Sequence, residues 1–321
     1  MPRPRIVIAG ASGVVGRHLI AAATDRYEVT VLTRGVAGPY PAGVTPVAWR
    51  PDAARSGDEE ALSRLTSALE DAAALVNLAG ASIADGRLGP SHVDRLLSSR
   101  VDSATTLVTA LQRCRVPPEV MVQASATGYY GQRGDDTLDE TADPDEAFVL
   151  GPVATASEAA AAPAAARVRL CVLRLGVVLA DDAQAWQRLL MPIRLGVGGR
   201  LGSGEQWLPW IDADDLARAF LFVIEQGDCD GVFNAVAPEP VRQRDLGRSA
   251  ARRLRRPFWF PAPAWLLRLV LGRLADGALL QSARVVPKRL TACGFEFEHG
   301  TVRAALDELL PKRERGSRAE G

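Results

Sequence analysis

Short apolar runs and amphipathic stretches alternate along the first 180 residues of the chain. The apolar runs lie at 6–9, 28–33, 74–78, 120–124 and 169–175, and their length is typical of strands that are buried on both faces. Amphipathic stretches between them, such as 59–69 and 93–112, favour helices. The alternation predicts an α/β fold with a doubly wound parallel sheet, in which ligands bind at the carboxyl ends of the strands.

The pattern loosens beyond residue 179. A glycine-rich run at 195–204 is followed by an expected helix at 214–226 and an expected strand at 232–235, and residues 242–310 have a helical and basic pattern. The last residues, 311–321, are typical of a disordered tail. We therefore expect a first domain at 1–180, whose sheet is completed by segments from 205–238, and a smaller, mostly helical substrate lobe at 181–310.

The most hydrophobic stretch of the chain is 258–280. Pro261, Pro263, Arg268 and Asp276 interrupt it too often for a helix that spans a membrane. We interpret the stretch as an amphipathic helix packed on protein, and a role at a membrane surface is the less favoured alternative.

Composition excludes several classes of protein. The 321 residues carry a formal net charge of +0, so we expect neither nucleic acid nor a membrane as a partner. Four scattered cysteines without a C-x-x-C pair suit a reducing compartment, and the N-terminus runs into the first strand without room for a signal peptide, so we expect a cytoplasmic protein. Three histidines occur singly, and we expect no metal site.

The turn after the first strand has the spacing of a phosphate-binding loop. Gly10, Gly13 and Gly16 lie three residues apart in RIVIAGASGVVGRHL. Glycine allows the sharp turn, the close approach of a pyrophosphate and the close packing of the next helix, whose first N–H groups bind the anion. The motif predicts a dinucleotide site, and a glycine turn without a ligand is the alternative.

Two further strand ends offer candidate cofactor contacts. The second strand ends in Thr33 and Arg34, where proteins that bind NAD usually have an acidic residue. A guanidinium suits the 2′-phosphate of NADP, although a solvent-facing arginine is the alternative. Another strand closes with small residues that would let a cofactor pass close to the backbone, in the run Asn77, Leu78, Ala79 and Gly80. Arg100 lies on the expected long helix at 93–112, and taken alone it is interpreted as a solvated charge.

Candidate chemistry follows the strand at 120–124. Ser125 and the turn that contains Tyr129 and Tyr130 could polarise a substrate carbonyl through their hydroxyl groups. The two tyrosines could equally be core aromatic residues that border the loop. Carboxylates later in the chain, Asp212 and Asp215, are interpreted as a helix cap.

Nine ordered segments of the chain form a characteristic series: GASGVVG, VTVLTR, LVNLAGASIADGR, SSRVDSATTLV, SATGYYGQRGD, LRLGVVL, RLGVGGRLGSGEQWLPWIDADDLA, NAVAPEPV and VVPKRL. Together they resemble one family, the atypical extended short-chain dehydrogenase/reductases, which includes NAD-dependent epimerase/dehydratase and nucleoside-diphosphate-sugar epimerase family proteins. The resemblance covers about residues 5–310 and includes the family's small C-terminal domain of unknown function.

The resemblance implies a Rossmann-type domain that binds NADP. It transfers cofactor contacts to the glycine loop and to residues after the next strands. These are Gly10, Ala11, Ser12, Gly13, Val14, Val15, Gly16, Thr33, Arg34, Asn77, Leu78, Ala79, Gly80 and Arg100.

The resemblance is weaker on catalysis. Typical members of the superfamily use a Tyr-x-x-x-Lys pair, whose positions fall near Pro152 and Ala156 in this chain, and no tyrosine or lysine occurs from 148 to 170. Three residues on the side of the active site also depart from the family pattern: Ala81, Leu88 and Ser157.

The leading hypothesis is an NADP-dependent oxidoreductase or epimerase-like enzyme. It would act on a small carbonyl or hydroxyl substrate, which could be nucleotide-linked, with Ser125 orienting the carbonyl and Tyr129 or Tyr130 assisting with the proton. The substrate would lie between this loop and residues 195–210. The rival is a catalytically silent NADPH-binding protein with a regulatory or interaction role, and a homodimer is left open.

Overall fold

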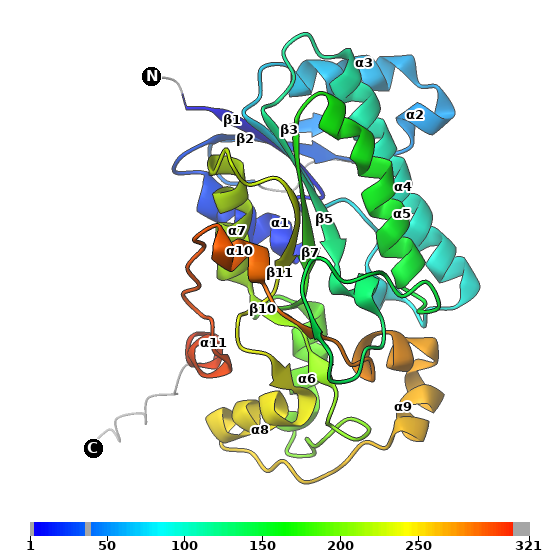
Figure 1. Ribbon diagram of the computed structural model, residues 1–321, viewed down its shortest axis with the longest axis vertical. Coiled ribbons are helices and arrows are strands. Elements are labelled where there is room, and N and C mark those ends of the chain that lie inside the picture. Colours follow the sequence, from blue (N-terminus) through cyan, green and yellow to red (C-terminus); the bar gives the residue numbers. More distant parts are fainter. Residues whose placement is uncertain (1–2, 36–39, 311–321) are drawn as a thin grey trace, which may run out of the picture.

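Seven parallel strands form the central sheet of the computed structural model, which describes residues 3–35 and 40–310 (Figure 1). Their order is β11-β7-β5-β4-β1-β2-β3. The strands are β1 (Arg5–Ala9), β2 (Glu28–Thr33), β3 (Val44–Ala48), β4 (Ala74–Asn77), β5 (Val120–Ala126), β7 (Arg169–Leu175) and β11 (Gly231–Ala235). The doubly wound α/β sheet that the sequence predicts is therefore confirmed, and its carboxyl ends meet along one edge.

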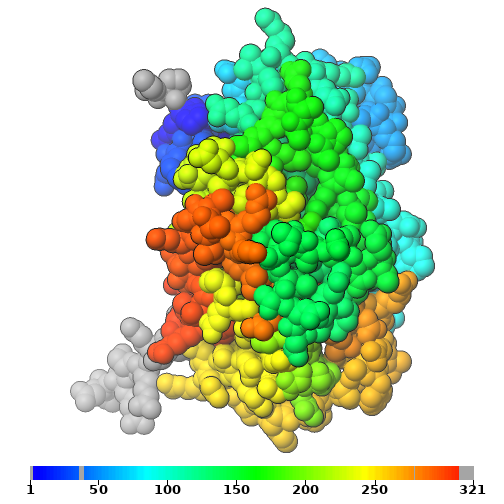
Figure 2. Space-filling view, viewed as in Figure 1, coloured from blue at the N-terminus to red at the C-terminus, as the bar shows by residue number. Residues whose placement is uncertain are grey.

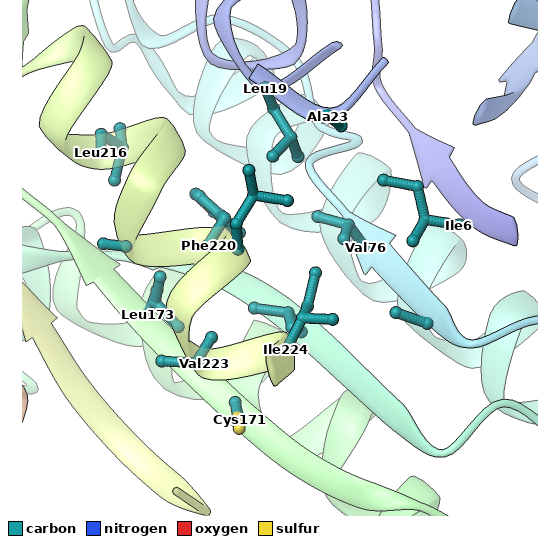
Figure 3. Close-up of a cluster of buried hydrophobic side chains, with 14 of the residues drawn as sticks. Ile6, Leu19, Ala23, Val76, Cys171, Leu173, Leu216, Phe220, Val223 and Ile224 are labelled. Atoms are coloured by element: carbon teal, nitrogen blue, oxygen red, sulfur yellow. The ribbon is translucent and has the colours of Figure 1, made fainter. Parts of the chain in front are cut away.

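Helices cover both faces of the sheet. One layer holds α1 (Val14–Ala23) and α7 (Ala213–Glu225), and the other holds α3 (Glu59–Leu69), α4 (Pro90–Arg113) and α5 (Gly151–Ala161). Alternate residues of β1 point to opposite layers, because Ile6 and Ile8 join the core beneath α1 and α7 whereas Val7 joins the other core. Figure 3 shows the first core, where Leu19 of α1 and Phe220 of α7 lie over the sheet.

A smaller lobe lies beyond the carboxyl ends of the strands, at the lower end of Figure 1. Its core contains Trp186, Trp210, Leu246 and Leu306. Strand β8 pairs with β10, β9 with β12, and β6 with β13. The remaining elements are α2 (Ala53–Ser56), η1 (Ile83–Asp85), η2 (Thr127–Tyr130), β6 (Thr137–Leu138), η3 (Ala162–Ala166), β8 (Val177–Leu179), α6 (Gln184–Arg194), β9 (Trp207–Leu208), β10 (Trp210–Asp212), β12 (Val241–Arg242), α8 (Gln243–Leu254), α9 (Ala264–Leu271), the π-helical turn η4 (Ala275–Leu279), β13 (Arg284–Val285), α10 (Lys288–Ala292) and α11 (Val302–Leu309).

The stretch 258–280 is not the single packed helix that the sequence suggests. Residues 258–262 run alongside 198–201 through isolated β-bridges, and only α9 is helical before the chain reaches η4. Pro261 and Pro263 keep the first part extended, and Gly272, with φ +60°, ends the helix. No residue of α9 is buried. The expectation of one helix over the whole stretch is therefore wrong, while α9 packs on the protein through half-buried residues such as Leu266 and Leu267.

Within 3–35 and 40–310, no helix combines the length and the apolar character that crossing a bilayer requires. The expected tail at 311–321 lies outside the described residues.

Candidate functional site

The glycine loop between β1 and α1 is built for close packing. Gly10 has φ +82°, and a Cβ on it would lie 2.5 Å from the backbone carbon of Leu78. A Cβ on Gly16 would lie 2.6 Å from the Cα of Ala11. Both positions therefore require glycine for reasons within the protein itself.

Gly13 differs from these two glycines because the protein leaves space next to it. The nearest heavy atom to a Cβ on Gly13 would be the Gly10 oxygen, at an ordinary contact distance of 3.5 Å. Gly13 caps the N-terminus of α1 without a side-chain hydrogen bond, and Val14 and Val15 follow as the first helical residues. The free space and the positive end of a ten-residue helix fit the pyrophosphate of a dinucleotide.

A second part of the site lies where β2 ends. Thr33 closes a short turn with Gly35, and Arg34 is exposed next to it. Arg34 lines an open surface recess together with Arg50 and Arg64. Asp58 and Glu60 line the same recess, and Arg50 and Arg64 each form an ion pair with one of them.

The residues at the end of β4 pack against the glycine loop and hold it in place. Asn77 is buried, donates to the side-chain oxygen of Gln123 at 2.8 Å and accepts from the backbone N–H of Ala79 at 3.1 Å. The Leu78 N–H donates to the Ala9 carbonyl. The Asn77 side chain thus holds the backbone of the turn in place.

Arg100 is a half-buried cation that lies between the turn after β4 and Ser125 at the end of β5. Its guanidinium donates only to the backbone carbonyls of Ala81 and Leu96, and within the described residues it forms no ion pair. Burial lowers the pKa of Arg100 from its ordinary value. It lies against Gly80, where a Cβ would come within 3.1 Å of its Cζ atom. A desolvated guanidinium without a counter-charge is suited to an anionic ligand.

Ser125 belongs to a chain of polar side chains at the ends of β5 and β7. Its hydroxyl donates to Oε1 of Glu158 on α5, at 2.6 Å. Arg174 on β7 donates to both oxygens of Glu158, at 2.9 and 2.8 Å, and only 4% of its side chain is exposed. Because the serine proton points to the carboxylate, the lone pairs of Ser125 Oγ remain able to accept a hydrogen bond.

The two tyrosines of the η2 turn have different surroundings. Tyr130 is fully buried, accepts from Arg174 at 3.0 Å and donates to Oδ1 of Asn234 at 2.7 Å. Desolvation raises the pKa of Tyr130 to about 12. Tyr129 is half-buried, and the guanidinium of Arg174 lies 3.4 Å from its ring centroid. The alternative that these tyrosines are core aromatic residues therefore applies to Tyr130, whose hydroxyl already has two hydrogen-bond partners.

A small open recess joins Ser125 and Arg100. Its other lining residues come from η1, the end of β5 and α5, and they are Ile83, Ala126, Leu150, Val153, Ala154 and Ser157. Of the two positions expected for the Tyr-x-x-x-Lys pair, Pro152 is exposed and Ala156 is half-buried, and neither lines the recess. Within the part of the chain that the structure describes, no group of three His, Cys, Asp or Glu residues is placed to hold a metal ion.

Sequence reasoning did not single out Glu158 and Arg174 as site residues. Both carry a signal, because Glu158 is the one charged residue in the alanine-rich run ATASEAAAA and Arg174 interrupts the apolar strand RLCVLRL. A charge in a position that should be buried needs a partner, and here each residue is the partner of the other.

Comparison with known proteins gives two family matches. The model of the NAD dependent epimerase/dehydratase family matches residues 6–235, and that of a domain of unknown function, DUF1731, matches residues 262–309. An epimerase family protein of Staphylococcus epidermidis is 34% identical over 309 residues, which cover 95% of this chain and 99% of that protein. One of Mycobacterium leprae is 32% identical and covers 94% of each chain.

Two solved structures are also similar. Human epimerase family protein SDR39U1 (isoform 2), crystallised with NADPH, has a TM-score of 0.82 at 29% identity and covers 95% of this chain and 99% of its own. The nucleoside-diphosphate sugar epimerase of Corynebacterium glutamicum has a TM-score of 0.73 at 28% identity, covering 96% of this chain and 58% of that protein.

Proposed function

Because this chain belongs to the NAD dependent epimerase/dehydratase family, we propose that it is an NADP-dependent oxidoreductase or epimerase-like enzyme for a small hydroxyl or carbonyl substrate. The observation that carries the proposal is the hydrogen-bonded chain from Ser125 through Glu158 to Arg174, beside the recess that Arg100 also lines. The family name and the NADPH in the crystal structure of the human relative support it.

The cofactor would be held at three places. The open space beside Gly13 and the N-terminus of α1 would take the pyrophosphate, and Arg34 would bind the 2′-phosphate that distinguishes NADP from NAD. Arg100 would give its unpaired charge to the phosphate or to the substrate. When bound, NADP supplies a carbon that accepts or donates a hydride.

Ser125 would orient the reacting group of the substrate. Its hydroxyl hydrogen is directed to Glu158, so its oxygen is set to accept a hydrogen bond from a substrate hydroxyl. The carbonyl form of the substrate needs a donor instead, and Ser125 would have to turn its hydrogen away from Glu158 to provide one. The arrangement therefore favours binding of the alcohol form.

Tyr129 is the phenol that we assign to proton exchange. It stacks on Arg174 and is half-buried, whereas the Tyr130 hydroxyl is engaged by Arg174 and Asn234. We assign Tyr130 the role of a positioning residue that fixes Arg174. A positioned proton donor contributes roughly 10²- to 10⁴-fold to a rate.

The substrate would be small and, given the nucleoside-diphosphate sugar epimerase among the relatives, could be nucleotide-linked. It would enter between the Ser125 loop and residues 195–210 of the lobe. Four free cysteines, of which Cys293 is exposed, fit the reducing cytoplasm that we propose as its compartment.

The second candidate function is a catalytically silent NADPH-binding protein. It is favoured by α5, which offers no tyrosine or lysine to the recess. The same fold would then use the cofactor only to stabilise a surface that binds a partner.

Turnover with a panel of sugar nucleotides, alcohols, aldehydes and ketones separates the two functions. Consumption or formation of NADPH is followed by absorbance, with Ser125→Ala and Tyr129→Phe as test variants and Thr155→Ala, on the same helix as Glu158, as the control. We expect both test variants to lose at least about 100-fold in kcat while their NADPH affinity is kept. Tight NADPH binding with no turnover on any of the substrates would favour the silent protein.

The preference for NADP is tested by titration with NADPH and NADH. Arg34→Ser should lose about 10- to 100-fold in NADPH affinity and leave NADH affinity unchanged, because a charge-assisted bond contributes roughly 1.5–3 kcal/mol. Arg115→Ser, at an exposed arginine near the amino end of β5, is the matched control. Equal wild-type affinities for the two cofactors would refute the assignment.

A further inference from the structure

Two stretches of the lobe have an unusual charge pattern. Residues 184–202 and 246–275 contain ten arginines and no aspartate, glutamate or lysine, although the whole chain balances 38 basic against 38 acidic residues. The net charge of zero therefore conceals a strongly basic region.

The same two stretches expose large apolar side chains. Among the described residues, ten large hydrophobic side chains are exposed, and eight of them lie here. Trp259 is 72% exposed and Trp265 is 66% exposed. The other six are Met191, Leu195, Val197, Phe260, Leu269 and Val270.

Backbone hydrogen bonds join the two stretches into one surface. The N–H groups of Trp259 and Phe260 both donate to the carbonyl of Gly198, and the N–H of Ala262 donates to that of Arg200. We call the surface formed by residues 191–200 and 252–273 the basic apolar face. Its longer segment, 252–273, is yellow to gold in Figures 1 and 2 and lies at the lower end of the molecule.

Most arginines of this face are available to a partner. Six exposed arginines have no carboxylate within 4.0 Å among residues 3–35 and 40–310, whereas Arg268 pairs with Asp276 and Arg253 with Asp307. The six are Arg194, Arg200, Arg252, Arg255, Arg256 and Arg273.

The charge determines what can cover the face. A second copy of the chain docked face to face would bring these arginines against one another, which is repulsive. Nucleic acid would match the arginines and leave the aliphatic side chains Leu195, Leu269 and Val270 without a partner. An anionic bilayer surface satisfies both sets, because guanidinium groups bind lipid phosphates while tryptophan and leucine side chains enter the layer between headgroups and acyl chains.

We propose that the basic apolar face docks this protein on the anionic headgroups of a lipid bilayer. The protein lies on the membrane and does not span it, in keeping with the short α9. The sequence-based expectation of no membrane partner rested on the overall charge, which averages this region with the acidic rest of the chain.

Flotation with lipid vesicles tests the proposal. Full-length protein is mixed with vesicles of phosphatidylcholine alone or with vesicles in which about a third of the lipid is phosphatidylglycerol, at low and at high salt. We expect at least about tenfold more bound protein on the anionic vesicles, and loss of that binding at high salt. Intrinsic tryptophan fluorescence should shift to the blue on binding.

Two variants separate the apolar and the charged contributions. Trp259→Ala with Trp265→Ala, and Arg255→Gln with Arg256→Gln, should each lower vesicle binding at least about tenfold. The matched control is Arg115→Gln with Val116→Ala, an exposed arginine and an exposed valine outside the face, and it should bind like the wild type. Unchanged melting temperatures and NADPH affinity show that the variants are folded.

Three results would overturn the proposal. These are an absence of binding to every vesicle, equal binding to neutral and anionic vesicles, and vesicle binding that both face variants retain. A stable dimer that the tryptophan variant dissociates, without vesicle binding by the wild type, would assign the face to a second copy.

Discussion

Replacing Gly13 by alanine should separate cofactor binding from folding. Gly13 is the N-cap of α1 with φ −73° and ψ 168°, angles that alanine adopts without strain. A Cβ there meets no protein atom closer than 3.5 Å. The methyl group would instead stand in the space that we assign to the pyrophosphate.

The two effects differ in size. At an N-cap, alanine is less favourable than glycine by roughly 0.5–1 kcal/mol, and the lower backbone entropy of alanine in the unfolded chain offsets a similar amount. We therefore expect the free energy of unfolding to change by less than about 1 kcal/mol. Loss of one or two charge-assisted bonds from N–H groups to phosphate should weaken NADPH binding by at least about 10- to 100-fold.

Gly89 provides the matched control. It caps α4 with nearly the same backbone angles, φ −70° and ψ 166°, and a Cβ on it meets nothing within 4 Å. Gly89→Ala should therefore have the same small effect on stability and none on cofactor affinity. Urea denaturation measures the first quantity and fluorescence titration with NADPH measures the second. Wild-type NADPH affinity in Gly13→Ala would refute the assignment of this loop to the pyrophosphate.

Three further predictions concern stability. Arg174→Met should cost about 3–5 kcal/mol because it leaves the carboxylate of Glu158 without its cation, and adding Glu158→Gln should restore part of this in urea denaturation; additive losses would contradict a paired charge. Gly10→Ala should destabilise far more than Gly43→Ala, since both have positive φ and only Gly10 is pressed against backbone; similar midpoints would exclude the clash. Burial raises the pKa of Tyr130 to about 12 from its ordinary value of about 10, so the unfolded chain releases this proton first and stability should fall as pH rises from 10 to 12, by up to about 3 kcal/mol. The Tyr130→Phe variant should show a flatter slope over that range, and an equally steep one would contradict this origin.

The local pattern was sufficient to predict most of the sheet. Buried parallel strands are continuous apolar runs, so β1, β2, β4, β5 and β7 stand out as strands, and their boundaries differ from the expected ones by two residues or fewer. The edge strand β3 was not predicted. Its sequence VTPVA contains Pro46 and has no buried residue, so it lacks the continuous apolar run that is typical of a buried strand.

Features that depend on distant pairing were harder to predict. Glu158 and Arg174 are sixteen residues apart, and only the packing of α5 on the sheet makes one the counter-charge of the other. The course of residues 258–262 depends on the partner segment at 198–201, which no local period records. The local hydrophobic pattern predicts individual helices and strands, whereas these contacts depend on how distant helices and strands pack against one another.

The position of β11 has a consequence for how the molecule is made. This strand pairs with β7, yet β8, α6, β9, β10 and α7 are encoded between the two. Asn234 of β11 also accepts the hydrogen bond from Tyr130. On the ribosome, the glycine loop emerges early, while the last strand of its sheet arrives only after the first part of the lobe, from β8 to β10, has been synthesised. A chain interrupted near residue 180 would display β7 as an unpaired edge, which invites aggregation. Truncation near residue 180 is therefore a poor way to isolate the nucleotide-binding half, because β11 is needed to cover the edge of β7.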